Sequence, residues 1–581
     1  MFRSIAQATS RHVMNAELAA YVSRTPIAIA LLTGICLFCY LPGVVLLPPV
    51  DRTEVIFAET VREMVARAAW LDPRYGDTVN QYHPVGAYWA QGVAASLFGS
   101  DLAQSISVYR IPSLVGVTLA TLALYWLSLP VVGALPAFLA AALFAVCPLT
   151  VLVAHLAIAD GLALMFAVVA MLALMRIYIG QEDDQRAPCD IRLGLLLWAA
   201  VGLGMLVNAL QIPVMIGLVA AALSIMDRDV SWLRRTRPEW GLPLALGLAA
   251  PWLVVRAAQD GVPYAGLDAW ALLDALSGSQ NMKHRALPGT FVLALLLGFL
   301  PGLAVLPDAM KKLWDERAGK RARFFLAWIV VTIAFLEIFS AKPGTYAVQS
   351  VFPALALVVA MLAGQVDLEV RSLRWSMILP PILGMALLLV FLVPPYAFSR
   401  ELPGPLAAIL CVGVVVLAAA AGRAEFVRVW LVLSITTFGL YAATMVGAVL
   451  PSVKLIWPTR QIATAAAACD ARPVWVVGFR EPSTVFSLGA DRRDLTAMPA
   501  DPRTLHFVES RSRGWYEVAM VKLGERPVEL GCVEGYNTMR GCPLTFTIFA
   551  RDPQQKNCSL PPQYACSNVK SQVRPSSRDC D

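Results

Sequence analysis

Long apolar runs alternate with short polar loops along roughly the first 450 of the 581 residues. An apolar run of about 17–25 residues has the length of a helix that crosses the hydrocarbon core of a bilayer. Thirteen runs fit this description, at 27–48, 109–127, 131–147, 160–179, 190–207, 210–226, 241–257, 288–307, 323–340, 346–364, 375–396, 403–422 and 427–450. The pattern predicts a mostly α, polytopic helical membrane domain over 27–451, after an N-terminal segment over 1–26.

The pattern changes after residue 451, where short β-branched and aromatic stretches replace the long apolar runs. Stretches of this kind between Gly, Pro and Asp residues are typical of strands. Four strands are predicted, at 474–479, 484–488, 515–521 and 544–550. Residues 452–581 are therefore expected to form a small soluble domain of α/β or α+β type.

The eleven cysteines fall into two groups. Five lie in or near predicted spans and are expected to be isolated thiols: Cys36, Cys39, Cys147, Cys189 and Cys411. Six lie in the soluble region: Cys469, Cys532, Cys542, Cys558, Cys566 and Cys580. An even number in a polar region predicts disulfides and an oxidising compartment, with unpaired thiols as the alternative.

Composition agrees with a membrane protein, because 58% of the residues are hydrophobic and only 15% are charged. The net charge of +7 does not indicate nucleic-acid binding, since the basic residues lie in separate short loops. Lysine and arginine concentrate in the cytoplasmic loops of membrane proteins. The basic loops here alternate so that the N-terminus is predicted to be cytoplasmic and, with an odd number of spans, the soluble domain external.

The loop over 49–108 lies on the predicted outer side and begins with a dense group of charges. Apolar residues at helical spacing over 54–69 predict an amphipathic helix on the outer membrane surface. Tyr88 and Trp89 begin a further predicted helix at the depth of the interfacial aromatic belt. Because a long charged loop beside a bilayer indicates a function, we interpret it as the active-site loop of a membrane-embedded transferase.

Three carboxylates are the candidate catalytic groups: Asp51, Glu54 and Asp160. Asp160 opens the fourth span close to His155, and ionisable residues at the mouth of a helix bundle indicate function. Asp51 and Glu54 are three residues apart and could act together, one of them as a general base. The alternative for each position is a helix start, where acidic residues serve as caps.

Cations from several outer loops could converge on one phosphate, which arginine and lysine bind through charge-assisted hydrogen bonds. Arg110 lies where the second span begins, Lys342 lies near Tyr346, and Arg285 follows His284. The alternative for each is a side chain that reaches lipid headgroups.

At these positions the chain resembles the GT-C superfamily of polyprenyl-phosphate-sugar-dependent transferases. The most similar branch contains the 4-amino-4-deoxy-L-arabinose lipid A transferases and the protein O-mannosyltransferases. The segments that resemble it are VDRTEVIFAETVREM, HPVGAYWAQGVAASLFG, YRIPSL, HLAIAD, HRALPG, SAKPGTY and VGFREPSTVFSLG. Their order along nearly the whole chain makes the resemblance more specific than any one motif.

The resemblance implies a glycosyltransferase in the bacterial inner membrane, with its active site and soluble domain in the periplasm. Its donor would be a polyprenyl-phosphate sugar and its acceptor an envelope glycolipid such as lipid A. Substrate binding is assigned by resemblance to Arg52, His83, Tyr88, Arg110, His155, Arg285, Lys342 and Tyr346. No cofactor is obligatory, although a divalent metal is compatible with the resemblance, with His284 and His83 as candidate ligands.

Some positions depart from the family pattern and motivate rival hypotheses. Thr53 stands where the family usually has aspartate, His83 replaces a phosphate-binding lysine, and Asn208 replaces the lysine of a Lys-Gly-Pro motif. One rival is a non-catalytic relative that binds polyprenyl lipid or serves as a scaffold for a partner enzyme. Another is a transporter or channel, which would need charges buried within its spans and an internal repeat. Glu337 is one of few charges within a predicted span, and the sequence shows no such repeat.

Overall fold

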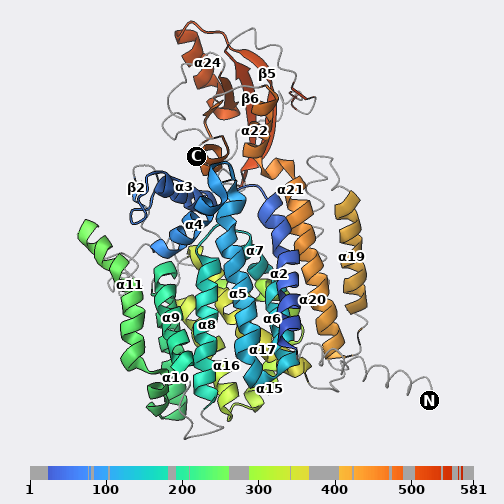
Figure 1. The fold of residues 1–581 in the computed structure, drawn as a ribbon. Coiled ribbons are helices and arrows are strands. Elements are labelled where there is room, and N and C mark those ends of the chain that lie inside the picture. Colours follow the sequence, from blue (N-terminus) through green and yellow to red (C-terminus); the bar gives the residue numbers. More distant parts are fainter. Residues whose placement is uncertain are drawn as a thin grey trace, which may run out of the picture.

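The computed structural model of the protein describes residues 24–50, 52–75, 78–79, 84–102, 105–180, 191–208, 210–260, 287–339, 342–364, 405–421, 424, 426–469, 474–479, 481–488, 504–537, 541–551, 560, 561, 564 and 566. A long helical body supports a smaller α+β domain at one end, as Figure 1 shows. The predicted fold class is confirmed.

The helices of the body run largely side by side (Figure 1). They are α2 (Thr25–Leu46), α3 (Thr53–Ala66), α4 (Val85–Leu102), α5 (Ile106–Val132), α6 (Ala134–Val146), α7 (Pro148–Ala154), α8 (Asp160–Ile179), α9 (Ile191–Asn208), α10 (Gln211–Asp227), η1 (Ser231–Thr236), α11 (Pro238–Asp260), α13 (Thr290–Gly298), α14 (Leu300–Leu303), α15 (Leu306–Asp315), α16 (Lys320–Phe339), η4 (Lys342–Val351), α17 (Phe352–Ala363), α19 (Pro405–Ala421), α20 (Val427–Thr444), η6 (Met445–Val449) and α21 (Leu450–Ser452).

Twelve of the thirteen predicted spans coincide with helices of this body. The remaining one, 375–396, lies outside the described residues. Among the described helices, six are long and apolar enough to cross a membrane alone, and the pair α6–α7 would add a seventh. That pair is bent by 65°. The bend falls at Pro148, which has no backbone N–H to continue the preceding helix.

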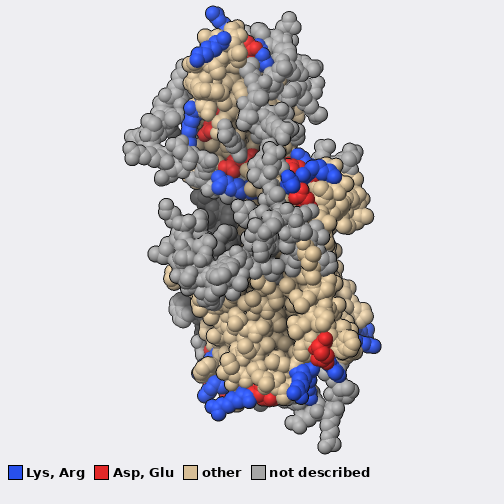
Figure 2. Space-filling view, turned by 90° about the vertical axis from the view of Figure 1, so that its left-hand side faces the viewer, with Lys and Arg blue, Asp and Glu red and all other residues tan. Residues whose placement is uncertain are grey.

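Charged side chains are confined to the ends of the body on the face that Figure 2 shows. Lysine and arginine gather at the end away from the α+β domain and near its junction with that domain, and the belt between is largely uncharged. This distribution suits a body that spans a bilayer. One acidic residue within a predicted span, Glu337, has a structural role: its carboxylate accepts the N–H groups of Gly289 and Val292, both at 3.0 Å, at the start of α13.

The α+β domain contains a four-stranded sheet of order β3-β4-β6-β5. Its strands are β3 (Val474–Val477), β4 (Leu505–Glu509), β5 (Val528–Asn537) and β6 (Cys542–Ala550), and its helices are η7 (Lys454–Ile456), α22 (Pro458–Ala468), α23 (Pro482–Leu488), η8 (Ser510–Ser512) and α24 (Arg513–Lys522). Strands β3 and β4 are parallel, and the other pairs are antiparallel. A two-stranded hairpin, β1 (Arg74–Tyr75) and β2 (Thr78–Val79), belongs to the body.

Two of the four predicted strands are confirmed and two are wrong. Residues 474–479 and 544–550 contain β3 and most of β6, whereas 484–488 and 515–521 belong to the helices α23 and α24. Helix α24 keeps an apolar side, with Tyr516 and Met520 four residues apart against the sheet. The strand prediction relied on a composition rich in Val, Trp and Tyr. The structure instead follows the helical spacing of the apolar residues, because tertiary packing decides between the two.

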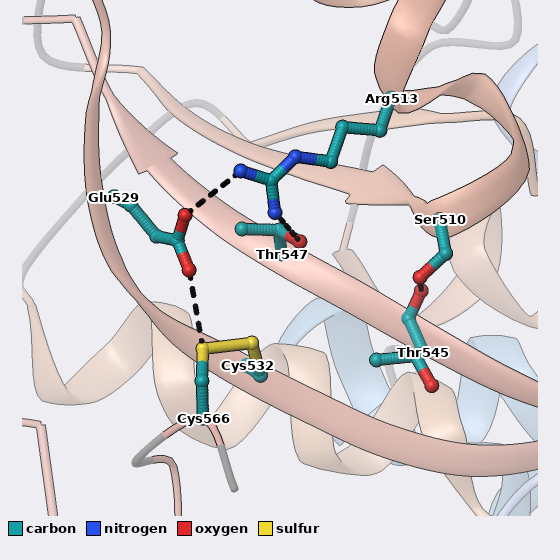
Figure 3. The surroundings of a disulfide bond; sticks show 7 residues. All are labelled: Ser510, Arg513, Glu529, Cys532, Thr545, Thr547 and Cys566. Atoms are coloured by element: carbon teal, nitrogen blue, oxygen red, sulfur yellow. Dashed lines mark hydrogen bonds and ion pairs between the residues drawn. A yellow bond between two sulfur atoms is a disulfide. The ribbon is translucent and has the colours of Figure 1, made fainter. Parts of the chain in front are cut away.

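The cysteine predictions are confirmed where the structure describes the sulfur atoms. Cys36, Cys39 and Cys147 are buried free thiols. Cys532 and Cys566 form a disulfide, and Cys469 and Cys542 are also disulfide-bonded. Cys189, Cys558 and Cys580 lie outside the described residues, as does the side chain of Cys411. Figure 3 shows the Cys532–Cys566 bond beside β5.

Candidate active site

A buried ion pair joins the start of α3 to the start of α5. Arg110 donates from Nε to Glu54 Oε1 at 2.7 Å and from Nη2 to Glu54 Oε2 at 2.8 Å. Both side chains are buried, at 0% and 1% exposure. The remaining Arg110 N–H groups donate to the carbonyls of Val44, Leu47 and Pro48.

The Glu54 carboxylate has further donors besides Arg110. The N–H of Ala157 donates to Oε1 at 2.9 Å, and the N–H of Val50 donates to Oε2 at 2.8 Å. Each carboxylate oxygen therefore accepts two hydrogen bonds. The pair ties the chain before α3 to α5 and to the loop that leads into α8.

Helix α3 is a helix as predicted, but its polar residues are not all turned to solvent. Glu54 and Glu59 are buried at 1% and 2% exposure. Glu59 pairs with Arg62 at 2.9 Å. The helix packs against α4 and against α23 of the α+β domain, and its predicted place on the outer membrane surface stays a prediction.

The α+β domain contacts the start of α3 through an ion pair with Arg52. Arg52 Nε and Nη2 donate to the two oxygens of Glu481 at 3.2 and 3.4 Å, and Asn537 donates to the same carboxylate at 3.2 Å. Arg52 has φ 63° and ψ −94°, a conformation that is costly for a residue with a side chain. This strained residue directly follows Asp51.

Apolar contacts reinforce this junction. The Phe486 ring on α23 meets Tyr109 edge to face, with a centroid distance of 6.0 Å. The Arg62 guanidinium lies 5.6 Å from the centroid of the same ring, within range of a cation–π interaction. Segments more than 400 residues apart in sequence thus meet at the start of the candidate active-site loop.

Asp160 is the first residue of α8, and close helix packing fixes its position. The next residue is Gly161, where an added Cβ would lie 2.8 Å from the Cα of Ser113 on α5. Ser113 Oγ donates to the carbonyl of Ile158 at 3.1 Å. A larger residue at position 161 would therefore separate α8 from α5 and displace Asp160.

A small polar pocket lies beside Asp160. Its polar lining comes from α8, α9, α10 and η4 and consists of Asp160, Asn208, Gln211, Gln349 and Ser350. Asn208 donates to Gln211 at 2.7 Å. Gln349 is buried, and its Oε1 has no hydrogen-bond partner among the described residues. The pocket thus offers an unused acceptor next to a carboxylate.

Two further predicted residues lie on η4, which begins at Lys342. Tyr346 is half-buried and lies within electrostatic range of both Asp160 and Glu54. The side chain of Lys342 lies outside the described residues. The structure therefore brings Glu54, Arg110, Asp160 and Tyr346 to the end of the body that faces the α+β domain.

Tyr88 and His155 are buried close to this region. The Tyr88 ring stacks on Phe57 of α3, with centroids 4.2 Å apart. His155 Nδ1 lies 2.6 Å from the Val151 carbonyl, and its ring meets Tyr40 edge to face. Asp51, His83, His284 and Arg285 lie outside the described residues, and the roles predicted for them stay predictions.

The role of His284 and His83 as ligands of a divalent metal likewise stays a prediction. Within the described part of the chain, Glu529, Cys532 and Cys566 are grouped closely enough to suggest a metal site. Figure 3 shows that the two sulfur atoms are joined and that Glu529 pairs with Arg513 at 3.0 Å. A disulfide offers no thiolate, so this group does not fit a metal ion.

Sequence reasoning missed Glu481, Asn537 and Gln349. Glu481 belongs to the VGFREPS segment, which carried the family resemblance but was given no role. Gln349 is a polar residue at the start of a predicted apolar span, a signal that could have identified it. Asn537 ends a strand that composition did not predict.

The fold defines a polytopic helical membrane protein with a small α+β domain and a polar cluster at one end of its helical body. Comparison with solved structures supports this class. The crystal structure of ArnT from Cupriavidus metallidurans bound to undecaprenyl phosphate matches with a TM-score of 0.66 at 17% identity, covering 89% of this chain and 97% of that one. The same protein in the apo state matches with a TM-score of 0.63 at 16% identity. At these identities the likeness shows the shared fold.

Sequence comparison finds relatives among lipid-phosphate-dependent sugar transferases. A family model described as dolichyl-phosphate-mannose-protein mannosyltransferase matches residues 82–255. The undecaprenyl phosphate-alpha-4-amino-4-deoxy-L-arabinose arabinosyl transferase of Erwinia tasmaniensis is 28% identical over 317 residues, 53% of this chain and 54% of that protein. The enzyme of the same name from Aeromonas hydrophila is 27% identical over 380 residues, 63% of this chain and 66% of that protein. The matches span about half to two thirds of these relatives, and they confirm the predicted resemblance.

Proposed function

We propose that this protein is a glycosyltransferase that moves a sugar from a polyprenyl-phosphate donor to lipid A or a related envelope glycolipid. The observation that carries the proposal is the gathering of Asp160, Tyr346 and Gln349 at the domain-facing end of a GT-C-type body, where Gln349 Oε1 has no partner among the described residues. The names of the sequence relatives support the donor and acceptor classes. The sugar named for those relatives, 4-amino-4-deoxy-L-arabinose, is the first to test.

The chemistry is a displacement at the anomeric carbon. A hydroxyl or phosphate oxygen of the acceptor attacks this carbon, the bond to the phosphate oxygen of the donor breaks, and polyprenyl phosphate leaves. Asp51 and Asp160 are the carboxylates proposed to accept a proton from the acceptor and to orient the sugar. The leaving phosphate keeps its negative charge, so catalysis rests mainly on positioning and on charge stabilisation.

Cations from the loops are proposed to stabilise the leaving phosphate. Lys342, Arg285 and His83 are the candidates, with Tyr346 as a hydrogen-bond donor. Arg52 is pre-oriented by Glu481, and 48% of its side chain remains exposed. It could therefore contact a phosphate while it keeps its partner.

Glu54 and Arg110 fit a positioning role better than the predicted roles of base and phosphate ligand. Each Glu54 oxygen already accepts two hydrogen bonds, and the N–H groups of Arg110 are engaged with five acceptor atoms. Proton uptake by Glu54 would break part of this network without solvent to compensate. We therefore assign the pair to holding the Asp51 segment against the loop that leads to Asp160.

The basic residues at the far end of the body support a cytoplasmic orientation for that end. The disulfide in the α+β domain supports an oxidising compartment for the other end. Together they favour a protein of the bacterial inner membrane whose proposed active site faces the periplasm. Sugar nucleotides are confined to the cytoplasm, which explains a lipid-linked donor.

Lipid analysis of a deletion strain tests the proposal. Mass spectrometry of envelope lipids is expected to show the loss of one sugar mass from the acceptor, and the wild-type gene should restore it. An Asp51→Asn/Asp160→Asn variant, expressed at the same level, should fail to restore it. Restoration by this variant would favour the non-catalytic alternative that Thr53 suggests, and an unchanged lipid profile in the deletion strain would refute the proposed function.

A further inference from the structure

The pocket beside Asp160 has room for a single small polar group. Its volume is about 20 Å³, and one enclosed water molecule needs roughly 10–15 Å³. Asp160 is the first residue of α8, and the pocket continues along two further turns of this helix into the body. The apolar part of its lining consists of Ala163, Leu164, Ala167, Ile212, Met215 and Ala347. A substituent of a larger ligand would fit the pocket, whereas a whole sugar ring would not.

Gln349 contributes a hydrogen-bond acceptor to this pocket. Its side chain is 2% exposed, and its Oε1 has no partner among the described residues. Gln349 lies three residues after Tyr346 on the 3-10 helix η4, where side chains three residues apart share one face. Tyr346 lies within electrostatic range of Asp160. The face of η4 that carries both residues is therefore turned toward the start of α8.

The other polar side chains of the lining have partners of their own. Asn208 donates to Gln211 Oε1 at 2.7 Å, and Ser350 Oγ donates to the carbonyl of Ala347 at 2.8 Å. Asp160 is the one charged residue among the lining residues that the structure describes. The pocket thus presents two acceptors, the Asp160 carboxylate and Gln349 Oε1, and its lining carries negative charge.

Two acceptors in so small a space distinguish an amine from a hydroxyl. A protonated amine has three N–H donors and a positive charge, so it can donate to both acceptors at once. A hydroxyl has one O–H donor and leaves one acceptor without a partner. An unpartnered acceptor in a buried site is costly. Because primary amines are mostly protonated near neutral pH, the pocket favours an ammonium group.

We propose that Gln349 is a specificity-determining residue that selects, together with Asp160, a donor sugar with a protonated primary amine. The inference rests on the proposed function, since it concerns the donor of that reaction. It gives Asp160 the task of orienting the sugar and leaves proton acceptance to Asp51. The small volume adds a second expectation, that a sugar with an acylated amine is excluded.

Transfer kinetics of the purified full-length protein with three donors test the proposal. The donors are undecaprenyl phosphates that carry 4-amino-4-deoxy-L-arabinose, L-arabinose with its 4-hydroxyl, or the 4-acetamido sugar, each with lipid A as acceptor. For wild type, kcat/KM should be about 10- to 100-fold lower with the 4-hydroxyl donor than with the amino donor. The acetamido donor should be at least about 100-fold poorer than the amino donor.

Variants at position 349 separate recognition from a structural role. Gln349→Met keeps the size of the side chain but removes the acceptor, and it should reduce the preference for the amino donor over the 4-hydroxyl donor at least about fivefold. Gln349→Glu keeps an acceptor oxygen and should retain the preference. A merely structural role of Gln349 would lower both rates together and leave their ratio unchanged.

Thr332→Val is the control. Thr332 on α16 lies outside the pocket lining, is 1% exposed, and its Oγ1 has no partner among the described residues. Its replacement by valine, which has nearly the same shape, should change neither rate by more than about twofold. The control therefore shows whether loss of any buried unpartnered oxygen alters the choice of donor.

Several outcomes would overturn the inference. Equal transfer from the amino and 4-hydroxyl donors by wild type, an unchanged ratio in Gln349→Met, or efficient transfer from the acetamido donor would each contradict it. The comparison of donors by wild type decides the matter even if Gln349→Met does not fold. Failure of the proposed function is a distinct result, in which a deletion strain keeps every sugar of its envelope lipids.

Discussion

Two polar clusters, one buried and one partly buried, lie at the domain-facing end of the helical body, and they differ in how fully their hydrogen-bonding groups are used. In the first, Glu54 and Arg110 satisfy each other and the surrounding backbone completely. In the second, Asp160 lies beside Gln349, whose Oε1 has no partner among the described residues. A satisfied buried pair gives structural specificity, whereas unused polar groups in a pocket are available to a substrate.

This difference separates predicted site residues that charge alone places together. Glu54 and Arg110 were predicted to be a base and a phosphate ligand because they are charged residues next to an outer loop. Their geometry instead supports a structural role, and it leaves Asp51 and Asp160 as the candidate chemical groups. Variants that affect one cluster and spare the other test this difference.

The largest effect is expected from Glu54→Gln, which leaves the Arg110 charge buried without its counterion. Removal of one partner from a buried ion pair costs about 3–5 kcal/mol. Thermal unfolding in detergent should therefore show a large loss of stability and a low yield of folded protein. Glu63→Gln on the same helix, which removes a partly exposed pair with Arg67, should cost less than about 1 kcal/mol. A Glu54→Gln protein with wild-type stability and no transferase activity would instead support a catalytic role for Glu54.

The next effect concerns Gly161, which allows α8 to approach α5. Gly161→Leu would clash with the Cα of Ser113 and shift Asp160, and a displacement of about 1 Å can lower the rate about 100-fold. The control is Gly217→Leu on α10, where an added Cβ meets no atom within 4 Å. Steady-state kinetics with purified protein should show the loss for position 161 alone. Equal activity of the two variants would show that the position of Asp160 is unimportant.

A smaller effect is expected at the junction with the α+β domain. Glu481→Gln removes the charge that holds Arg52, and we expect an approximately tenfold lower kcat with the KM for the acceptor little changed. The charge reversal Arg52→Glu/Glu481→Arg should recover part of the loss, because it restores the ion pair across the junction. If Arg52→Glu and Glu481→Arg alone each had a kcat no lower than that of the double variant, the ion pair would not position the Asp51 segment.

The smallest effect is expected at His506, a buried residue far along the chain from both clusters. Its Nδ1 is bound to Tyr516, and its Nε2 has no partner among the described residues. Burial, with a smaller contribution from Arg551, lowers the pKa of His506 from 6.5 to about 4. The folded state keeps the imidazole neutral, so stability is complete above pH 6.5 and falls as the pH drops toward 4.

Thermal unfolding at pH 7 and pH 6 measures this dependence. Wild type should lose up to about 1 kcal/mol between these values, and His506→Gln should lose less. Activity at pH 7 should be the same in both proteins. Loss of transfer in His506→Gln would contradict this expectation. It would show that His506 is needed for activity although it lies outside the Asp160 pocket.

The membrane body was predictable from the sequence, because the length and apolar character of each run determine whether it can span a bilayer. The elements of the α+β domain were less predictable. Residues 484–488 and 515–521 are of types that favour strands, yet they form helices. The Glu54–Arg110 pair joins residues 56 positions apart, and Arg52 reaches a partner 429 positions away. No local pattern contains such partners, so sequence identified the charged residues but not which were already satisfied.

The most direct test is sugar transfer by the purified protein from undecaprenyl-phosphate-linked 4-amino-4-deoxy-L-arabinose to lipid A, followed by mass spectrometry. We expect transfer by wild type and a decrease in kcat of about 10²–10⁴-fold in both Asp51→Asn and Asp160→Asn, each with an unchanged unfolding temperature. Full activity in both variants would contradict it.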